Sequence, residues 1–182
     1  MWDDPGPVDV PRIDPLLDAL AAAEPAPGSG TAAALAGAMA AALCTKVARL
    51  SGDGGASAQG AALCRRLTAL ADEDARLFRA ALDELGRRND DFALGRTVAE
   101  TADALLGIAE ACVDVAALAG ALGANAAPEH QADARAASAL AAGATRAAAV
   151  LVEVNLTVTT DDERLRLARR LSEQAEAHSS GS

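Results

Sequence analysis

The chain has 182 residues, of which 51% are hydrophobic and only 2% aromatic, and it carries a formal net charge of −10. This length predicts a single domain over residues 1–182, with its core at about 14–177, and the acidic balance argues against a nucleic-acid-binding surface. The apolar runs are Ala-rich and interrupted by polar residues, and the acidic N-terminus lacks a signal-peptide pattern, so we expect a cytoplasmic protein without a membrane span.

Helix signals recur along the chain, and no alternating strand pattern is present. We expect an all-α bundle of about six helices, several of them long and Ala-rich, at residues 14–23, 31–50, 57–88, 92–122, 129–158 and, after a cap at 159–162, up to 177. Asp14 suits the N-cap of the first helix, and Ser29 or Thr31 that of the second. Residues 178–182 are expected to form a disordered tail. Long Ala-rich helices in so short a chain favour burial of one face against a second copy, which predicts a homodimer.

A loop rich in Pro and Gly, at residues 24–30, leads into the second helix. Gly28 and Gly30 allow backbone conformations that are closed to other residues. The first turn of the helix presents N–H groups without internal partners, and these can receive an anion or a polar ligand. On spacing alone an ordinary helix start is the commoner explanation, because the stretch is neither a P-loop nor a dinucleotide-binding fingerprint.

Asp74 occupies a position in the third helix where the apolar series predicts Leu. Burying a carboxylate without a partner costs several kcal/mol, roughly 2–7 even for neutral polar groups. Two explanations therefore stay open: a functional carboxylate, or a structural one paired with Arg65, Arg66 or Arg76. The apolar series on either side of Asp74 consists of Leu63, Leu67, Leu70, Leu77, Ala81 and Leu85.

Two further polar side chains interrupt an apolar stripe of the fifth helix. Asp133 and Asn155 lie within roughly 40° of one helical face. The helix dipole also explains an acid near the helix start at Asp133, whereas Asn155 lies deep in an apolar run. Lys46, the only Lys in the chain, lies on the apolar stripe of the second helix. It either reaches solvent along its aliphatic stem or is buried as a cation or base with a lowered pKa.

The cysteines and histidines do not form a recognisable site. Cys44, Cys64 and Cys112 lie far apart without metal-ligand spacing, so we expect buried thiols rather than disulfides or a metal centre. His130 and His178, the only histidines, fall in an expected turn and in the tail, which argues against a zinc site or a His-based catalytic triad.

The opening of the second helix resembles that of a known family. Residues 25–38 are similar to the Pro-Ala-Pro-Gly-Gly-Gly-Ser opening of the cyclodeaminase/cyclohydrolase family, which includes the C-terminal domain of formiminotransferase-cyclodeaminase and bacterial methenyltetrahydrofolate cyclohydrolases. The resemblance covers about residues 14–165. Later landmarks of the family follow in the same order and are Asp74 with Phe78, Asn125 with Asp133, and Asn155 with Leu156.

This resemblance implies an all-helical dimer that acts on the one-carbon bridge between N5 and N10 of tetrahydrofolate. Family members hydrolyse 5,10-methenyltetrahydrofolate to 10-formyltetrahydrofolate, or cyclise formimino-tetrahydrofolate with loss of ammonia, and neither reaction needs a metal. By resemblance, Asp74 and Asp133 are the expected catalytic residues. The expected substrate-binding residues are Gly28, Ser29, Gly30, Thr31, Lys46, Asn125 and Asn155.

The chain departs from the family pattern at several of these positions. Ser29 interrupts the triple glycine, Lys46 replaces a Met, and Leu151 stands where the family has Asn. Two alternatives therefore stay open. The fold could serve another small nitrogenous substrate, for example in secondary metabolism, or it could form a non-catalytic helical dimer that acts as a binding module.

Overall fold

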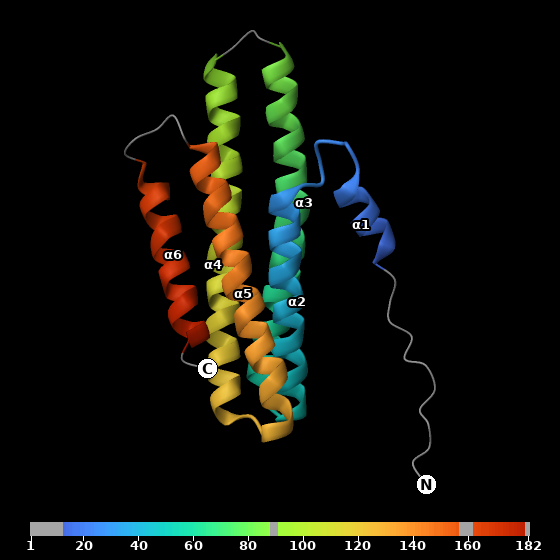
Figure 1. The fold of residues 1–182 in the computed structure, drawn as a ribbon, viewed down its shortest axis with the longest axis vertical. Coiled ribbons are helices and arrows are strands. Elements are labelled where there is room, and N and C mark those ends of the chain that lie inside the picture. Colours follow the sequence, from blue (N-terminus) through green and yellow to red (C-terminus); the bar gives the residue numbers. More distant parts are fainter. Residues whose placement is uncertain (1–12, 88–90, 157–161, 181–182) are drawn as a thin grey trace.

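The computed structural model describes residues 13–87, 91–156 and 162–180. This described part contains six helices and no strand (Figure 1), so the predicted all-α fold is confirmed. The helices are α1 (Asp14–Ala21), α2 (Ser29–Leu50), α3 (Gly54–Arg87), α4 (Asp91–Asn125), α5 (Pro128–Asn155) and α6 (Glu163–Ser180).

The predicted caps of the first two helices are wrong. Gly28 is the N-cap of α2, without a side-chain hydrogen bond, and Thr31 lies inside the first turn. Its hydroxyl instead donates a hydrogen bond to Asp74 of the neighbouring helix α3. Asp14 likewise lies inside α1, and Ile13 occupies the N-cap position.

The C-terminal helix is longer than predicted. α6 continues through Ser180, so the expectation of a disordered tail is wrong for residues 178–180, and residues 181–182 lie outside the described part. The predicted ends of the third and fifth helices, at residues 88 and 158, also lie outside it. The physical reason is that the last turns of α6 are polar and resemble a tail in composition, although they continue the helix.

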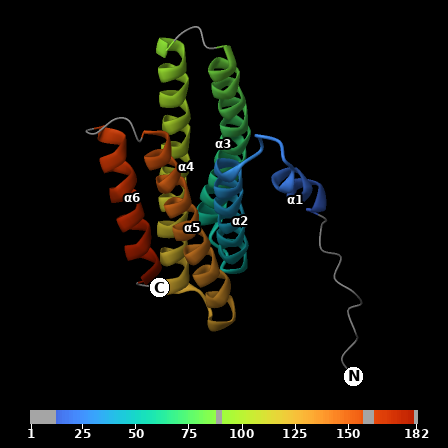
Figure 2. The ribbon, with the colours of Figure 1, turned by 45° about the horizontal axis from the view of Figure 1, so that its top comes forward.

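Helices α2, α3, α4 and α5 form an antiparallel four-helix bundle in which each packs on the next and α5 closes back onto α2. α6 packs on α4 and α5. The two longest helices, α3 and α4, extend beyond the start of α2 and the end of α5 at one end of the bundle (Figures 1 and 2). At that end the start of α2 and the end of α5 therefore lie next to the projecting parts of α3 and α4.

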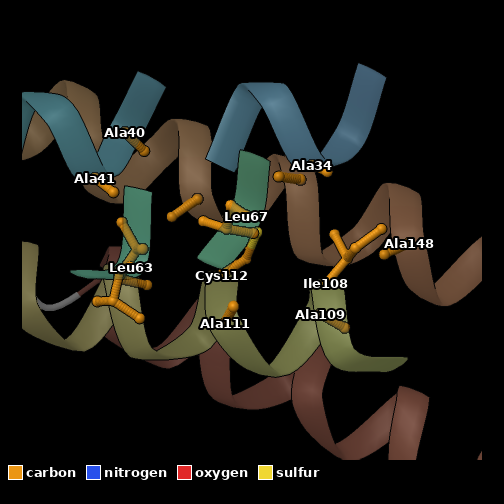
Figure 3. Close-up of a cluster of buried hydrophobic side chains, with 14 of the residues drawn as sticks. Ala34, Ala40, Ala41, Leu63, Leu67, Ile108, Ala109, Ala111, Cys112 and Ala148 are labelled. Carbon is orange, nitrogen blue, oxygen red and sulfur yellow. The ribbon is translucent and has the colours of Figure 1, made fainter. Parts of the chain in front are cut away.

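The core is built from small side chains, which let the helices approach closely (Figure 3). At Gly37 of α2, an added Cβ would overlap the Cys112 sulfur and lie 3.2 Å from Leu67, so only glycine fits there. Cys44 and Cys112 are fully buried, and burial raises the pKa of both thiols to about 12. Cys64 is only half-buried. The predicted buried thiols are thus confirmed for two of the three cysteines.

Among the residues that the structure describes, three helical segments are long and apolar enough to cross a membrane by length and composition: Ser29–Leu50, Gly95–Asn125 and Pro128–Asn155. The expectation that no segment would qualify as a span is wrong on these two measures. The physical reason is that runs of Ala count as apolar even though they carry little side-chain surface. Half or more of each apolar window is buried within the bundle, where small side chains allow close helix packing.

Helix α1 stands apart from the four-helix bundle (Figures 1 and 2). None of its residues is buried, and the side chains of Ile13 and Leu17 are 53% and 50% exposed. The loop from residue 22 to residue 28 connects it to the start of α2.

Candidate functional site

A cavity of about 170 Å³ lies at the end of the bundle where α2 begins and α5 ends. α2 and α5 are antiparallel neighbours, so the start of one meets the end of the other, and the projecting parts of α3 and α4 form the walls. The lining residues are Pro25, Gly28, Ser29 and Gly30 of the loop and first turn of α2, Asp74 and Phe78 of α3, Thr101 and Leu105 of α4, and Leu151 and Asn155 of α5.

Asp74 places a buried carboxylate against the first turn of α2. The residue is only 6% exposed. The Thr31 hydroxyl donates to Asp74 Oδ2 at 3.2 Å, with the Ala71 carbonyl as a second acceptor at 3.4 Å, and the Thr31 backbone N–H also donates to the carboxylate. At Gly30 an added Cβ would overlap the carboxylate and lie 2.6 Å from Oδ2. The positive end of the α2 dipole and the free N–H groups of its first turn therefore stabilise the negative charge of the Asp74 carboxylate.

The electrostatic state of Asp74 follows from these contacts. Burial raises its pKa above the ordinary value of 3.8, and the hydrogen bonds from the Thr31 side chain and backbone offset part of that rise. No cationic side chain in the described part of the chain contributes to lowering the pKa of Asp74. The cavity thus contains a carboxylate that is ready to accept a proton or to pair with a positive charge supplied by a ligand.

The structural alternative for Asp74, a nearby arginine partner, is wrong. Arg66 pairs with two carboxylates of α4, and Arg76 pairs with a carboxylate of its own helix. Arg65 is exposed. All three arginines therefore face away from the helix start that holds Asp74, because α3 buries only its apolar face and the arginines lie on the solvent side.

The remaining walls of the cavity are mainly apolar. Phe78, Leu105 and Leu151 line it from three different helices, while Asn155 is half-buried at the end of α5. A polar floor with apolar walls suits a flat ring whose polar or cationic edge reaches Asp74.

The second predicted catalytic carboxylate, Asp133, lies at the opposite end of the α2–α5 pair. Lys46 Nζ lies 2.7 Å from Asp133 Oδ2, and the two side chains are 58% and 32% exposed. Lys46 follows Gly30 by 16 residues, which corresponds to about 24 Å along a helix. Lys46 thus reaches solvent, one of its two predicted states, and within one chain neither member of the pair approaches Asp74.

Asn125 also lies far from the cavity. It is exposed at the C-terminal end of α4, and its side-chain amide donates to the Ala121 carbonyl at 2.9 Å. It borders a separate surface hollow with Ser51 and Asp53. Of the predicted site residues, the structure therefore groups Gly28, Ser29, Gly30, Thr31, Asp74 and Asn155 at one end of the bundle, and Lys46, Asp133 and Asn125 at the other.

Two lining residues of α4, Thr101 and Leu105, were not identified from the sequence. Thr101 is buried, and its hydroxyl donates to the Thr97 carbonyl one turn earlier at 2.9 Å. A Thr on an Ala-rich helical face is too ordinary a signal to indicate a site. Across the described residues, no group of three or more His, Cys, Asp or Glu side chains is placed to hold a metal ion.

Comparisons with known proteins agree with this architecture. A family model described as formiminotransferase-cyclodeaminase matches residues 12–176. Among solved structures, the crystal structure of formiminotetrahydrofolate cyclodeaminase from Thermotoga maritima is similar, with a TM-score of 0.82 and 20% sequence identity over 93% of this chain and 90% of that one. At that identity the likeness shows a shared fold. No curated protein matches the sequence.

Proposed function

This chain belongs to the formiminotransferase-cyclodeaminase family, and we propose that it is a cytoplasmic, homodimeric enzyme of folate one-carbon metabolism. Its substrate is a tetrahydrofolate derivative with a one-carbon unit on N5 or bridging N5 and N10. The observation that carries the proposal is Asp74, a buried carboxylate at the floor of a cavity with apolar walls.

In the hydrolytic reaction, the amidinium of 5,10-methenyltetrahydrofolate is the cation that Asp74 does not find among the described residues of its own chain. Water adds to the amidinium carbon, and Asp74 accepts a proton from that water. The C–N5 bond of the tetrahedral carbon then breaks as a proton reaches N5, and 10-formyltetrahydrofolate results. One proton of the water ends on N5 and the other in solvent. A carboxylate with a raised pKa suits both the acceptance and the return of the proton.

In the cyclising reaction, N10 adds to the formimino carbon attached to N5. The resulting tetrahedral carbon expels ammonia, and the amidinium of the methenyl product forms. Asp74 serves here by holding the proton that the leaving nitrogen requires and by pairing with the product cation. Both reactions pass through a tetrahedral carbon between two nitrogens, so the same carboxylate supports either one.

A second substrate class is favoured by two of the lining residues. Ser29 and Leu151 both border the cavity, and these are positions where the chain departs from the family pattern. Leu151 offers no hydrogen bond, so a ligand edge that an Asn would bind meets an apolar wall instead. Another small nitrogenous cation with an apolar edge is therefore the alternative substrate. A thermal-shift screen of reduced folates against such compounds separates the two, because a ligand that binds only the native state raises its stability.

The test uses both folate reactions with purified protein. Decay of methenyltetrahydrofolate absorbance reports hydrolysis, and ammonia release from formimino-tetrahydrofolate reports cyclisation. We expect Asp74→Asn to lower the active rate by about 10²–10⁴-fold, the range for loss of a general acid–base group. Asp72→Asn is the matched control, because Asp72 lies on the same helix but is exposed, and we expect its rate to equal that of the wild type. A wild-type protein at micromolar concentration that catalyses neither reaction would overturn the proposal.

A further inference from the structure

One face of α3 loses its cover where α2 begins. α2 packs on α3 as far as its first turn, where Gly30 lies against Asp74. Steps of four and three residues continue the Asp74 face past the start of α2, and there Phe78 and Leu85 are 38% and 57% exposed. We call this uncovered face the α3 stripe, and it consists of Phe78, Ala81, Leu82 and Leu85.

Helix α1, with its N-cap Ile13, carries an apolar face of the same kind. Ile13 and Leu17 are 53% and 50% exposed, no residue of α1 is buried, and α1 makes no extended packing contact with another helix in the described part of the chain. Its large apolar side chains follow one another at steps of three, one and three residues, which are also the steps of the α3 stripe. We call them the α1 stripe, and they are Ile13, Leu16, Leu17 and Leu20.

The two stripes match in length and direction. Each covers about 10 Å along its helix. α1 leads through residues 22–28 into α2, and α2 runs antiparallel to α3 (Figure 1). An α1 placed in line with α2 therefore runs antiparallel to the α3 stripe. In that register Leu20 lies beside Phe78, next to the cavity, and Ile13 lies beside Leu85.

The charges that flank the stripes are complementary in this register. Asp18 directly follows Leu17, and Arg79 directly follows Phe78, so each charge lies on the same flank of its own stripe. Equivalent flanks of two antiparallel helices face one another, and with Leu20 beside Phe78 the two charges lie within one residue of the same level. Both side chains are exposed. An aspartate and an arginine thus meet when the stripes pack together.

We propose that α1 is a lid that turns about residues 22–28, packs antiparallel on the α3 stripe of its own chain and closes the Asp74 cavity with Leu20. The structure shows the open position, in which α1 stands apart from the bundle (Figures 1 and 2). Residues 22–25 are exposed, so the loop turns without uncovering a packed side chain. Pro25 and Gly28 of the same loop line the cavity, which places the hinge directly at its edge.

The size of the cavity supports a closing element. At about 170 Å³ it is smaller than the roughly 300–1,000 Å³ typical of pockets that enclose a drug-sized ligand. A docked α1 adds Leu20 beside Phe78 as a further apolar wall and covers the part of a flat ring that extends out of the cavity. A ligand that contacts the lid favours the closed state, and closure in turn strengthens binding. This role in binding rests on the proposed function, whereas the docking of α1 does not.

The first test is a disulfide between the two stripes. In a Cys64→Ser background, we expect oxidised Leu17→Cys/Leu82→Cys protein to lose both new thiols and to stay at the monomer mass of 18.2 kDa, since the other two native cysteines are fully buried. Pro15→Cys/Leu82→Cys is the matched control, because Pro15 is exposed on the opposite face of α1 and shares the same tether. We expect it to crosslink at least about ten-fold more slowly. Equal rates for the two pairs, or a disulfide that joins two chains, overturn the proposal.

The second test reverses the flanking charges in the Leu17→Cys/Leu82→Cys protein. We expect Asp18→Arg to slow crosslinking about two- to five-fold, the factor that corresponds to an exposed ion pair, and the further change Arg79→Asp to restore the rate. Both positions are exposed, so neither substitution disturbs the core. A single variant that crosslinks at the parent rate, or a double variant that stays slow, contradicts the antiparallel register and with it the proposal.

The third test asks whether closure serves binding. We expect Leu17→Asp to raise KM about ten- to hundred-fold, the factor that corresponds to the burial of one leucine side chain, and to leave kcat within about two-fold, because Leu17 does not reach the Asp74 carboxylate. Leu50→Asp is the control, since Leu50 is 52% exposed at the far end of α2, and it should keep the wild-type KM. An unchanged KM in Leu17→Asp contradicts the role of the lid in binding. If the wild type is inactive on both folate substrates, the proposed function fails, and the crosslink still decides whether α1 docks.

Discussion

The two ends of α2 hold a carboxylate in opposite ways. At its start, Asp74 is 6% exposed and contacts Gly30 and Thr31, and among the described residues only hydrogen bonds stabilise its charge. At its end, Asp133 is 32% exposed and pairs with Lys46 in solvent. In the described part of the chain no counter-charge faces the first carboxylate, whereas an ammonium group neutralises the second locally. Residue type alone therefore does not distinguish these two carboxylates, whereas their surroundings do.

Of the substitutions at the Asp74 end of α2, Gly30→Ala should lower the stability of the protein most. The new Cβ would overlap the Asp74 carboxylate and force it out of its hydrogen bond with Thr31 in the first turn of α2. We expect the free energy of unfolding to fall by about 1–3 kcal/mol, as for other overpacked cores, and activity to be lost with it. Urea denaturation measures the first and the folate assays the second. Gly54→Ala is the control, because a Cβ there meets nothing within 4 Å. Equal losses for both variants would show that the close contact at Gly30 is unimportant.

The second prediction concerns pH. Burial raises the pKa of Asp74 above 3.8, so the native chain binds more protons than the unfolded chain between pH 3.8 and the native pKa. Stability from this group is therefore greatest below that window and falls as pH rises through it, by at most about 1.4 kcal/mol per pH unit. Asp74→Asn should gain stability relative to the wild type over the same window. Parallel urea denaturation curves at several pH values measure the difference, and a difference that is constant with pH would contradict the raised pKa.

Thr31→Val should also destabilise the Asp74 end of α2, through a lost hydrogen bond rather than a steric overlap. The variant keeps the side-chain shape but removes the hydroxyl that donates to Asp74 Oδ2 at 3.2 Å. We expect a loss of about 1–3 kcal/mol in stability, because a buried acceptor loses a partner. The pKa of Asp74 should rise further, which moves the acidic limb of the activity profile to higher pH. Thr68→Val is the control, since its hydroxyl bonds only its own helix, at an exposed position. An unshifted acidic limb would mean that Asp74 does not set it.

Lys46→Met should change stability least. The pair it breaks is largely in solvent, and exposed ion pairs contribute about 0–1 kcal/mol. We therefore expect an unfolding free energy close to that of the wild type by the same denaturation measurement. Arg169→Met, which breaks a more exposed pair with Glu153, serves as the reference. A loss well above that of the reference would show that the ion pair is a structural element of the bundle.

Much of the fold could be predicted because the helical spacing of apolar residues can be recognised within each segment of the sequence. The apolar series around Leu67 and Leu77 predicted the buried face of α3, and both residues are buried. Helix ends were less predictable. Ser29, a good N-cap residue, instead begins α2 because Gly28 takes the extended cap conformation. The polar last turns of α6 resemble a tail in composition, although they continue the helix.

The site was only partly predictable. Asp74 stood out because a carboxylate broke an apolar stripe, and its burial agrees with that signal. Its partner could not be predicted, since the contact with Gly30 and Thr31 depends on how two helices register in space. Asp133 and Asn155 share a helical face, but they are 22 residues apart, about 33 Å along a helix. The shared face drew them together in the prediction, although the rise of the helix already separates them along the bundle.

The contact between Asp74 and the start of α2 also has a kinetic consequence. α2 and α3 are joined by residues 51–53 alone, so Gly30, Thr31 and Asp74 belong to one helical hairpin that is local in sequence. Contacts between elements close in sequence pay less loop-closure entropy and tend to form early during folding. We therefore expect the contact between Thr31 and Asp74, which spans 43 residues within one hairpin, to form before Leu151 and Asn155 of α5 join the cavity from much farther along the chain.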